Sequence, residues 1–350
     1  MGKLRDRLVL KLGEVHPKSE LLPWLKGYIP HPDSYIRNSI PIEKRLYYAK
    51  LGYTEFLAEM NIELNFDQAL AIGALISGDY HTGYMIEPPR FGKSFIMGAL
   101  ANYLAMHSYS VSVVASKSSR TAKVMEHARR HLRGASIDMK NMLVEESKAS
   151  ISKADKLLGR SETAYSKSRI VFKNGNKIDT KSTGDTFSSM DSDENIGEGS
   201  HVLIDEMDFI SERALTELGR REFERDDGES LILFGISNPR FLNHFHESVT
   251  NPNLKDDEFV IWGNIVTSME SDSIKMTPEE VLASDFARTE ESIRINLLCE
   301  YDENSSEFFN APMIVAPRHD ISSISPRTIS ALGIDSAYKG SDGITLALSM

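Results

Sequence analysis

The sequence predicts an α/β protein in which helices flank a mostly parallel central sheet. Three short runs of apolar residues, rich in β-branched side chains, predict buried strands at Val111–Ala115, His201–Ile204 and Leu231–Ile236. Helical patterns separate these runs, and strands that alternate with helices form parallel sheets. Polar residues follow two of the runs directly, at the sheet edge where open α/β folds place their sites.

The elements before the second strand follow from local signals. Residues 1–63 predict an N-terminal helical appendage, which prolines break into short pieces. A helix is expected from near Asp67 to Gly78, because glycine ends helices. A short strand at Tyr84–Ile86 and an apolar helix from Ser94 to about His107 come next, with a loop between them. The prolines of the appendage are Pro23, Pro30, Pro32 and Pro41.

The later elements have equally local signals. Asn174-Gly175 between two alternating runs predicts a hairpin, and Thr277-Pro278-Glu279-Glu280 has the N-cap, first-turn proline and capping-box glutamate of a helix start. In chain order, the other predicted elements are a basic amphipathic helix from Ser116 to about Arg133, a helix around Val144–Leu158, hairpin strands Arg169–Phe172 and Lys177–Thr180, a polar loop Thr183–Gly199, and strands Phe259–Val266 and Ile329–Ile334.

Composition and charge exclude several classes of protein. No stretch of the 350 residues approaches the roughly 18 consecutive apolar residues of a membrane helix, so no membrane partner is expected. The single cysteine, Cys299, excludes an internal disulfide and a cysteine-based zinc site. The net charge is −11, but residues 116–181 hold 16 Lys or Arg against 7 Asp or Glu. A local basic face matters more to a polyanion than the total charge does.

Residues Glu87–Ser94 match part of the phosphate-binding pattern G-x-x-x-x-G-K-[ST]. Gly92, Lys93 and Ser94 supply its turn, its phosphate-binding ammonium and its Mg²⁺-binding hydroxyl. Glu87 replaces the first glycine, and the two prolines after it cannot donate an N–H. A plain helix N-terminus with a chance Lys-Ser is the alternative. The residues expected to contact ATP here are Pro89, Arg90, Phe91, Gly92, Lys93 and Ser94, and Lys93 and Arg90 are also candidate catalytic residues.

Arg90 leaves two roles open. Its guanidinium can stabilise the charge of the γ-phosphate, or it can cap the loop through a salt bridge.

Asp205 and Glu206 end the predicted strand that starts at His201. In ATPases with a phosphate loop the first acid binds Mg²⁺ and the second polarises the attacking water. We therefore expect Ser94 and Asp205 to hold Mg²⁺ and Glu206 to be catalytic. An ordinary strand end with acidic turn residues is the alternative. Asp208, three residues further on, is expected to be solvated.

Two further segments are candidates for contacts with the nucleotide. Ser237-Asn238-Pro239 follows the third strand, and Asn238 there can sense the γ-phosphate; a simple strand exit into a proline turn is the alternative. Gln68 lies about twenty residues before the phosphate loop, and a glutamine amide can bond both a donor and an acceptor on the edge of adenine. A helix-capping segment with an exposed Gln68 is the alternative.

In this order, Gln68, a Gly-Lys-Ser loop with Arg90, the Asp-Glu pair and a strand ending in Ser-Asn-Pro resemble the large terminase subunit of tailed bacteriophages. The resemblance spans about Phe66 to Met350. It implies a P-loop (ASCE/RecA-like) ATPase that uses ATP and Mg²⁺ to drive double-stranded DNA into a procapsid. It also implies a homo-oligomeric ring, the portal protein and the small terminase subunit as partners, and a location in the host cytoplasm at the procapsid portal.

The segment Gly333–Gly343 resembles the first hairpin of the family's RNase H-like nuclease. In such nucleases an aspartate of the first strand helps to hold two divalent metal ions, Mg²⁺ or Mn²⁺. Asp335 matches that position, and Asp342 lies across the expected turn. Further acids from later strands are not among these 350 residues, so the nuclease is expected to be incomplete here. The predicted domains are the appendage at 1–63, the ATPase domain with its C-terminal linker at 64–325, and the start of a truncated nuclease at 326–350.

The family often carries Arg-Gly before the acid-pair strand, where this chain has Glu194-Asn195-Ile196-Gly197. A trans-acting arginine must then come from elsewhere, with Arg160 and Arg169 as candidates. The basic helix after the second strand can contact DNA phosphates, contact a neighbouring subunit, or be a solvated face. Its cations are Lys117, Arg120, Lys123, Arg129, Arg130 and Arg133.

Two other functions compete with the packaging motor. One is a helicase-like, nucleic-acid-stimulated ATPase, which needs a second complete ATPase domain for which little chain remains after Asn238. The other is a non-catalytic scaffold with a degenerate nucleotide site, which Glu87 and the two prolines favour.

Overall fold

The computed structural model describes residues 37–143, 169–183, 200–210, 214–215, 230–270, 274 and 276–301, and the strands 331–335 and 345–349. Residues 1–305 and 306–350 form two separate units. The first unit contains a sheet of eight strands, and the second contains a pair of strands. Within the described residues, no helix is long and apolar enough to cross a membrane.

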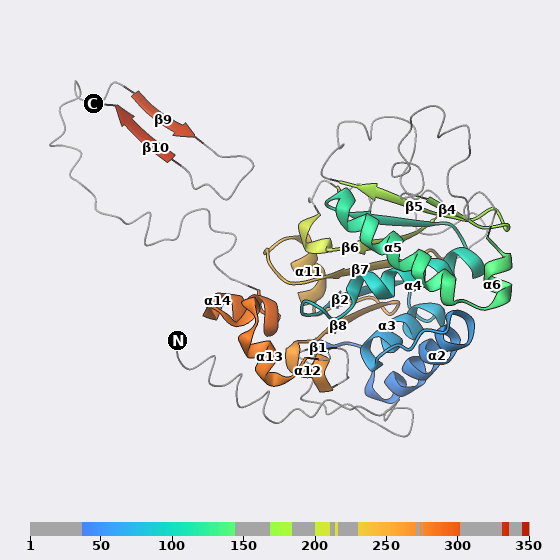
Figure 1. Ribbon diagram of the computed structural model, residues 1–350. Coiled ribbons are helices and arrows are strands. Elements are labelled where there is room, and N and C mark those ends of the chain that lie inside the picture. Colours follow the sequence, from blue (N-terminus) through green and yellow to red (C-terminus); the bar gives the residue numbers. More distant parts are fainter. Residues whose placement is uncertain are drawn as a thin grey trace. The chain divides into compact units, whose positions relative to one another are not determined.

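The central sheet is mostly parallel, which confirms the predicted α/β class (Figure 1). Six neighbouring strands run parallel to one another, and the two edge strands are antiparallel. The strand order across the sheet is β1 (Arg37–Asn38), β8 (Glu258–Trp262), β2 (Thr82–Ile86), β7 (Leu233–Ser237), β6 (His201–Asp205), β3 (Val111–Ala115), β5 (Lys177–Ser182) and β4 (Arg169–Val171).

The strand before the phosphate loop and the strand before the acid pair are not direct neighbours. Strand β7 lies between β2 and β6. The registers pair Ile86 with Ser237, and Asp205 with Ile236 and Ala115. The carboxyl ends of these strands therefore lie at one edge of the sheet, as the sequence predicted.

Alternate residues of the inner strands face two different cores. On one face, Met85 and Leu203 pack with α2 (Ile42–Met60), α3 (Phe66–Ile76), α4 (Lys93–His107) and α5 (Ser118–Gly134). On the other face, Ile86 and Ile204 pack with α11 (His244–Thr250). Side chains of a strand alternate between its faces, so continuous apolar runs belong to strands that are covered on both sides.

The described part of the predicted helical appendage is not all helical, because Arg37–Asn38 form the edge strand β1 of the sheet. The 19-residue helix α2 follows and starts directly after Pro41. Its buried face belongs to the same core as α3 and α4, so no break between cores is visible near residue 63. Helices α2 and α3 cross at Gly52 and Gly73. A Cβ atom added to Gly73 would lie 1.8 Å from the backbone oxygen of Tyr48, so only glycine fits at this crossing.

Several local predictions are confirmed and one is wrong. The hairpin β4–β5 forms, with Gly175 at φ +90°, and Thr277 and Glu280 make the predicted capping box of α13 (Pro278–Ala283). The predicted strand Phe259–Val266 ends at Trp262. Helix α12 (Ile265–Glu270) follows it, because the side chain of Asn264 accepts hydrogen bonds from the first amides of that helix. The predicted helix Val144–Leu158 and loop Thr183–Gly199 fall outside the described residues, apart from Thr183 itself.

The chain after β8 builds a small core of its own. Side chains of α12, α13, η5 (Asp285–Ala287) and η6 (Ile293–Leu297) pack together there, and the three-residue helix α14 (Glu290–Ser292) leads into η6. We call the described residues between 263 and 298 the C-terminal helical subdomain. Its core is separate from the two cores on the faces of the sheet.

In the second unit, β9 (Ala331–Asp335) pairs antiparallel with β10 (Thr345–Ser349), and Asp335 lies opposite Thr345. The predicted strand and hairpin are therefore present in the backbone. Asp342 falls outside the described residues, so its predicted metal role stays a prediction.

Candidate active site

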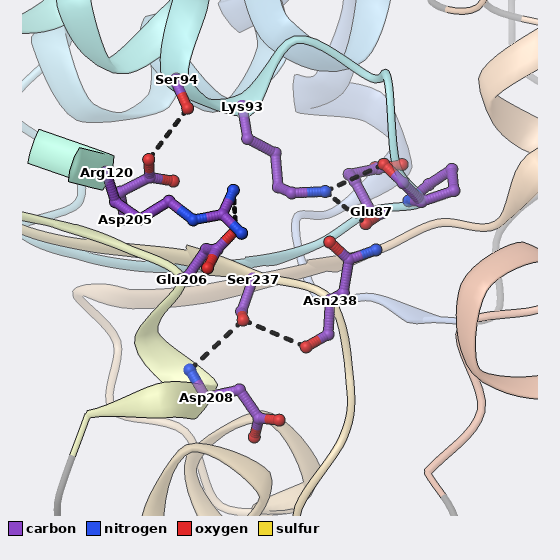
Figure 2. Close-up of polar contacts among 10 residues, drawn as sticks. Glu87, Lys93, Ser94, Arg120, Asp205, Glu206, Asp208, Ser237 and Asn238 are labelled. Atoms are coloured by element: carbon purple, nitrogen blue, oxygen red, sulfur yellow. Dashed lines mark hydrogen bonds and ion pairs between the residues drawn. The ribbon is translucent and has the colours of Figure 1, made fainter. Parts of the chain in front are cut away.

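Three strand ends and one loop build the candidate site. Strands β2, β6 and β7 end side by side, and the loop after β2 leads into the N-terminus of α4. Figure 2 shows the side chains of Lys93, Asp205, Glu206 and Asn238 gathered around this edge. The structure thus brings together residues that are up to 151 positions apart, from Glu87 to Asn238.

The phosphate loop has two residues in the left-handed region, Arg90 at φ +70° and Gly92 at φ +96°. A side chain at Gly92 would be strained by this backbone. It would also meet a neighbour, because an added Cβ would lie 2.9 Å from Nε2 of Gln68. The backbone conformation therefore favours glycine at position 92, and a side chain there would also displace the amide of Gln68.

Lys93 begins helix α4 and points back into its own loop. Its Nζ donates hydrogen bonds to the backbone oxygens of Glu87 and Pro88, both at 2.9 Å (Figure 2). Burial lowers the pKa of Lys93, and the charges of Glu87, Asp205 and Glu206 oppose that shift. An ammonium group in a desolvated position interacts strongly with anions, because the local dielectric constant is low.

Ser94 and Asp205 are in direct contact. Ser94 Oγ donates a hydrogen bond to Asp205 Oδ2 at 2.9 Å. Asp205 is 1% exposed, and this burial raises its pKa, whereas the hydrogen bond from Ser94 lowers it. A buried carboxylate beside a hydroxyl can supply the protein ligands of a Mg²⁺ ion. In nucleotide sites Mg²⁺ usually takes only one or two protein ligands, and phosphate and water oxygens complete its octahedral coordination. No group of three or more His, Cys, Asp or Glu within the described residues forms an alternative metal site.

Glu206 has a left-handed backbone, with φ +54° and ψ 53°, at the step from β6 into the turn η4 (Met207–Phe209). Its carboxylate forms an ion pair with Arg120, with 2.7 Å between Nη1 and Oε1. Arg120 comes from the first turn of α5. From its sequence position, Arg120 is only one of the cations of the predicted basic helix. A signal was present, since α5 follows β3 and β3 neighbours the acid-pair strand.

The expectation for Asp208 is wrong, because its side chain is buried rather than solvated. Asp208 is 1% exposed, and Oδ2 accepts a hydrogen bond from the backbone N–H of Phe241 at 2.9 Å. Its backbone oxygen accepts from Nδ2 of Asn243 at 2.7 Å. Burial raises the pKa of Asp208 to about 7, although these hydrogen bonds oppose the shift. Asp208 therefore links the turn after the acid pair to Phe241 and Asn243, which follow β7, through hydrogen bonds.

Ser237 is the last residue of β7 and Asn238 follows it, and β7 lies between β6 and β2 in the sheet (Figure 2). Ser237 Oγ accepts a hydrogen bond from the backbone of Asp208 at 3.3 Å and donates to the backbone oxygen of Asn238 at 3.0 Å. The side-chain nitrogen of Asn238 is buried and has no hydrogen-bond partner among the described residues. A buried donor of this kind fits a polar ligand.

Gln68 and Arg90 have protein contacts of their own. Nε2 of Gln68 donates to the backbone oxygen of Phe91 at 3.0 Å, and its Oε1 caps helix α3 at the backbone of Asn65. Gln68 is buried rather than exposed, and its amide supports the phosphate loop. Nη1 of Arg90 contacts the sulfur of Met276 at 3.4 Å, in the C-terminal helical subdomain. Their predicted nucleotide contacts stay predictions. Of the two candidate trans-acting arginines, Arg169 pairs with Asp179, and Arg160 is outside the described residues.

Comparisons with known proteins give only distant likenesses, to solved structures. No protein-family model matches the sequence, and no curated protein matches it. A solved structure with a similar fold is a mutant of the large terminase ATPase domain from Thermus phage P74-26. It is 14% identical, the match covers 66% of this chain and 93% of that chain, and the TM-score is 0.44. A likeness at this level identifies neither a family nor a function.

Proposed function

We propose that this chain binds Mg-ATP between the phosphate loop and the Asp205–Glu206 pair, hydrolyses it, and uses the energy to move double-stranded DNA into a viral procapsid. The proposal of Mg-ATP binding and hydrolysis rests on the 2.9 Å hydrogen bond between Ser94 and Asp205. It joins the hydroxyl of one motif to the carboxylate of the other, as a shared Mg²⁺ requires. The DNA-packaging part is supported by the order of the sequence motifs and by the exposed cations of helix α5.

Each side chain of the candidate site has its own role in the proposed ATP hydrolysis. Lys93 exchanges its hydrogen bonds with backbone oxygens of Glu87 and Pro88 for oxygens of the β- and γ-phosphates. Ser94 and Asp205 would hold Mg²⁺, which neutralises phosphate charge. Glu206 leaves Arg120 and accepts a hydrogen bond from the attacking water. Asn238, with its buried free N–H, senses the γ-phosphate.

The decisive experiment is ATP hydrolysis by the wild type and by Glu206→Gln, with Glu126→Gln on the exposed face of α5 as the matched control. Removing a general base should lower kcat by about 10²- to 10⁴-fold, while Mg-ATP binding and the control rate stay near wild type. Equal turnover in the wild type and in Glu206→Gln would overturn the catalytic assignment.

The proposed motor acts as a homo-oligomeric ring on the portal, together with the small terminase subunit, in the host cytoplasm. In a longer protein, Asp335 and Asp342 would contribute to a Mg²⁺- or Mn²⁺-dependent nuclease. The proposed packaging activity is tested by measuring DNA-stimulated ATP hydrolysis and the uptake of DNA into portal-bearing procapsids. ATP hydrolysis without any DNA or procapsid response would argue against packaging.

One observation favours the non-catalytic scaffold as a second candidate. The ion pair with Arg120 occupies the Glu206 carboxylate that hydrolysis needs. Calorimetric titration with ATP, with and without Mg²⁺, separates the two candidates. A scaffold with a degenerate site would not bind ATP even when DNA and partner proteins are present.

A further inference from the structure

Glu87 stands where phosphate-loop sequences usually have their first glycine, and its carboxylate is completely buried. Its Oε2 accepts a hydrogen bond from Ser268 Oγ at 3.0 Å, and Ser268 is itself completely buried. Its Oε1 has no hydrogen-bond partner among the described residues. Glu87 is therefore not an exposed, unconstrained replacement of the glycine. Its carboxylate occupies a specific place in the interior.

The chain around the carboxylate is shaped to receive it. Gly263 follows β8, and a Cβ atom added there would lie 2.6 Å from both carboxylate oxygens of Glu87. Gly263 also donates its N–H to the backbone oxygen of Ile86 at 2.9 Å. A glycine at 263 and a serine at 268 are thus matched to a glutamate at 87, across about 180 residues of sequence.

Glu87 also contacts the lysine of the loop. Its backbone oxygen accepts one of the two loop hydrogen bonds of Lys93. Burial and the neighbouring carboxylate of Asp67 raise the pKa of Glu87 well above its ordinary value, whereas Ser268 and Lys93 lower it. Lys93 and Ser268 are therefore the two groups that stabilise a charged Glu87. When Lys93 turns to phosphate oxygens, one of them is withdrawn.

Ser268 lies on α12, the first helix of the C-terminal helical subdomain. That subdomain has a separate core, so a displacement of α12 moves its packed helices together. A second contact joins the same two parts, between Arg90 of the loop and Met276 just before α13. The phosphate loop thus touches the subdomain at both its start and its middle.

We propose that Glu87 is a positioning residue that couples the nucleotide state of the phosphate loop to the C-terminal helical subdomain, through its hydrogen bond with Ser268. The inference rests on the proposed function, because it requires that the loop binds ATP. Lys93 moves the backbone of Glu87, the carboxylate carries that movement to Ser268, and α12 follows. The coupling is reciprocal, so the position of α12 also sets the affinity of the loop for nucleotide.

The test is hydrogen–deuterium exchange of the whole chain, with and without Mg²⁺ and a non-hydrolysable ATP analogue. In the wild type, the analogue should protect the start of α4 and also change the exchange of α12. Ser268→Ala should keep the protection at α4 and lose the response of α12. Ser284→Ala is the matched control, because its hydroxyl lies in the same subdomain but bonds to the backbone oxygen of Val281. It should respond like the wild type.

Two changes at position 87 separate the hydrogen bond from general packing. Glu87→Gln keeps an oxygen that can accept from Ser268 and should keep the α12 response, whereas Glu87→Ala should lose it. An unchanged α12 response in Ser268→Ala overturns the inference, even if ATP binds. Absence of protection at α4 in the wild type has a different meaning. It overturns the proposed function, and the inference with it.

Discussion

Arg120 on helix α5 and Glu206 after strand β6 form an ion pair of 2.7 Å at the centre of the candidate site. Glu206 is 17% exposed and Arg120 is 42% exposed, so the pair lies at the border between protein and solvent. The carboxylate proposed to activate water is therefore held by a cation from the basic helix proposed to face DNA. In the proposed function, opening of this ion pair would couple DNA contact to ATP hydrolysis.

Replacement of Arg120 by alanine should raise the rate of ATP hydrolysis without DNA. The carboxylate of Glu206 is then free to bind water. The gain should be about two- to fivefold, because a partly exposed ion pair holds its partner by at most about 1 kcal/mol. Steady-state turnover measures this, and Lys123→Ala, an exposed cation on the same helix, is the control. A lower rate in Arg120→Ala alone would mean that Arg120 itself serves the reaction.

Asp208 should make the stability of the protein depend on pH. Its pKa rises from the ordinary 3.8 to about 7 on folding, because burial disfavours the charge. The folded state then binds the proton more tightly than the unfolded state. This contribution to stability is complete below about pH 4 and is lost as pH rises through about 7.

Asp208→Asn keeps an oxygen for the N–H of Phe241 but cannot titrate. Urea unfolding between pH 4 and 8 should therefore show the variant gaining stability relative to the wild type as pH rises. Asp256→Asn, an exposed position, should follow the wild-type curve. A constant difference between Asp208→Asn and the wild type across this range would show that Asp208 does not titrate there.

Gly73→Ala should destabilise the fold strongly. The added Cβ meets the backbone oxygen of Tyr48, and a backbone atom cannot move aside as a flexible side chain can. The loss should be about 3 kcal/mol, at the upper end of overpacking costs. Chemical denaturation measures it. In Gly134→Ala the nearest atom is 3.4 Å from the new Cβ, so that variant should stay near wild-type stability. Equal stability of both variants would mean that α2 and α3 are not packed closely at Gly52 and Gly73.

The exposed cations of α5 should carry non-specific DNA binding. Of the predicted set, Arg120 pairs with Glu206 and Arg130 pairs with Glu126. Lys117 at the N-cap of α5 is exposed, and on the helix itself so are Lys123 and Arg133. The double change of Lys123 and Arg133 to alanine should weaken binding to unrelated duplexes equally and reduce the salt slope of log K by about 2. Fluorescence anisotropy at several salt concentrations measures both effects.

The matched control is the double change of Lys44 and Lys50 to alanine, which removes the same charge from the exposed face of α2. It should leave the salt slope near that of the wild type. If both double variants lose affinity equally, net charge rather than the face of α5 governs the interaction.

The sequence by itself determined the α/β class, the inner strands of the sheet and the strand ends that carry the site. Val111–Ala115 and the run from His201 are apolar on both faces, and only strands buried on both sides tolerate that pattern. Gly92, Lys93 and Ser94 could be assigned to the junction of a loop and a helix, because backbone conformation and helix start are local properties. The predicted end of the strand Phe259–Val266 was wrong, because the side chain of Asn264 caps a helix that begins there. Apolar periodicity does not reveal such a helix start.

The partners of the charged side chains were decided only by the tertiary structure. Nothing near Glu87 in the sequence indicates Ser268, nothing near Glu206 indicates Arg120, and Asp208 looked like a solvated turn residue. Each of these side chains is placed by elements that lie far away along the chain. The free energy of a buried carboxylate depends on the few groups within hydrogen-bonding distance, and only the folded chain sets those distances.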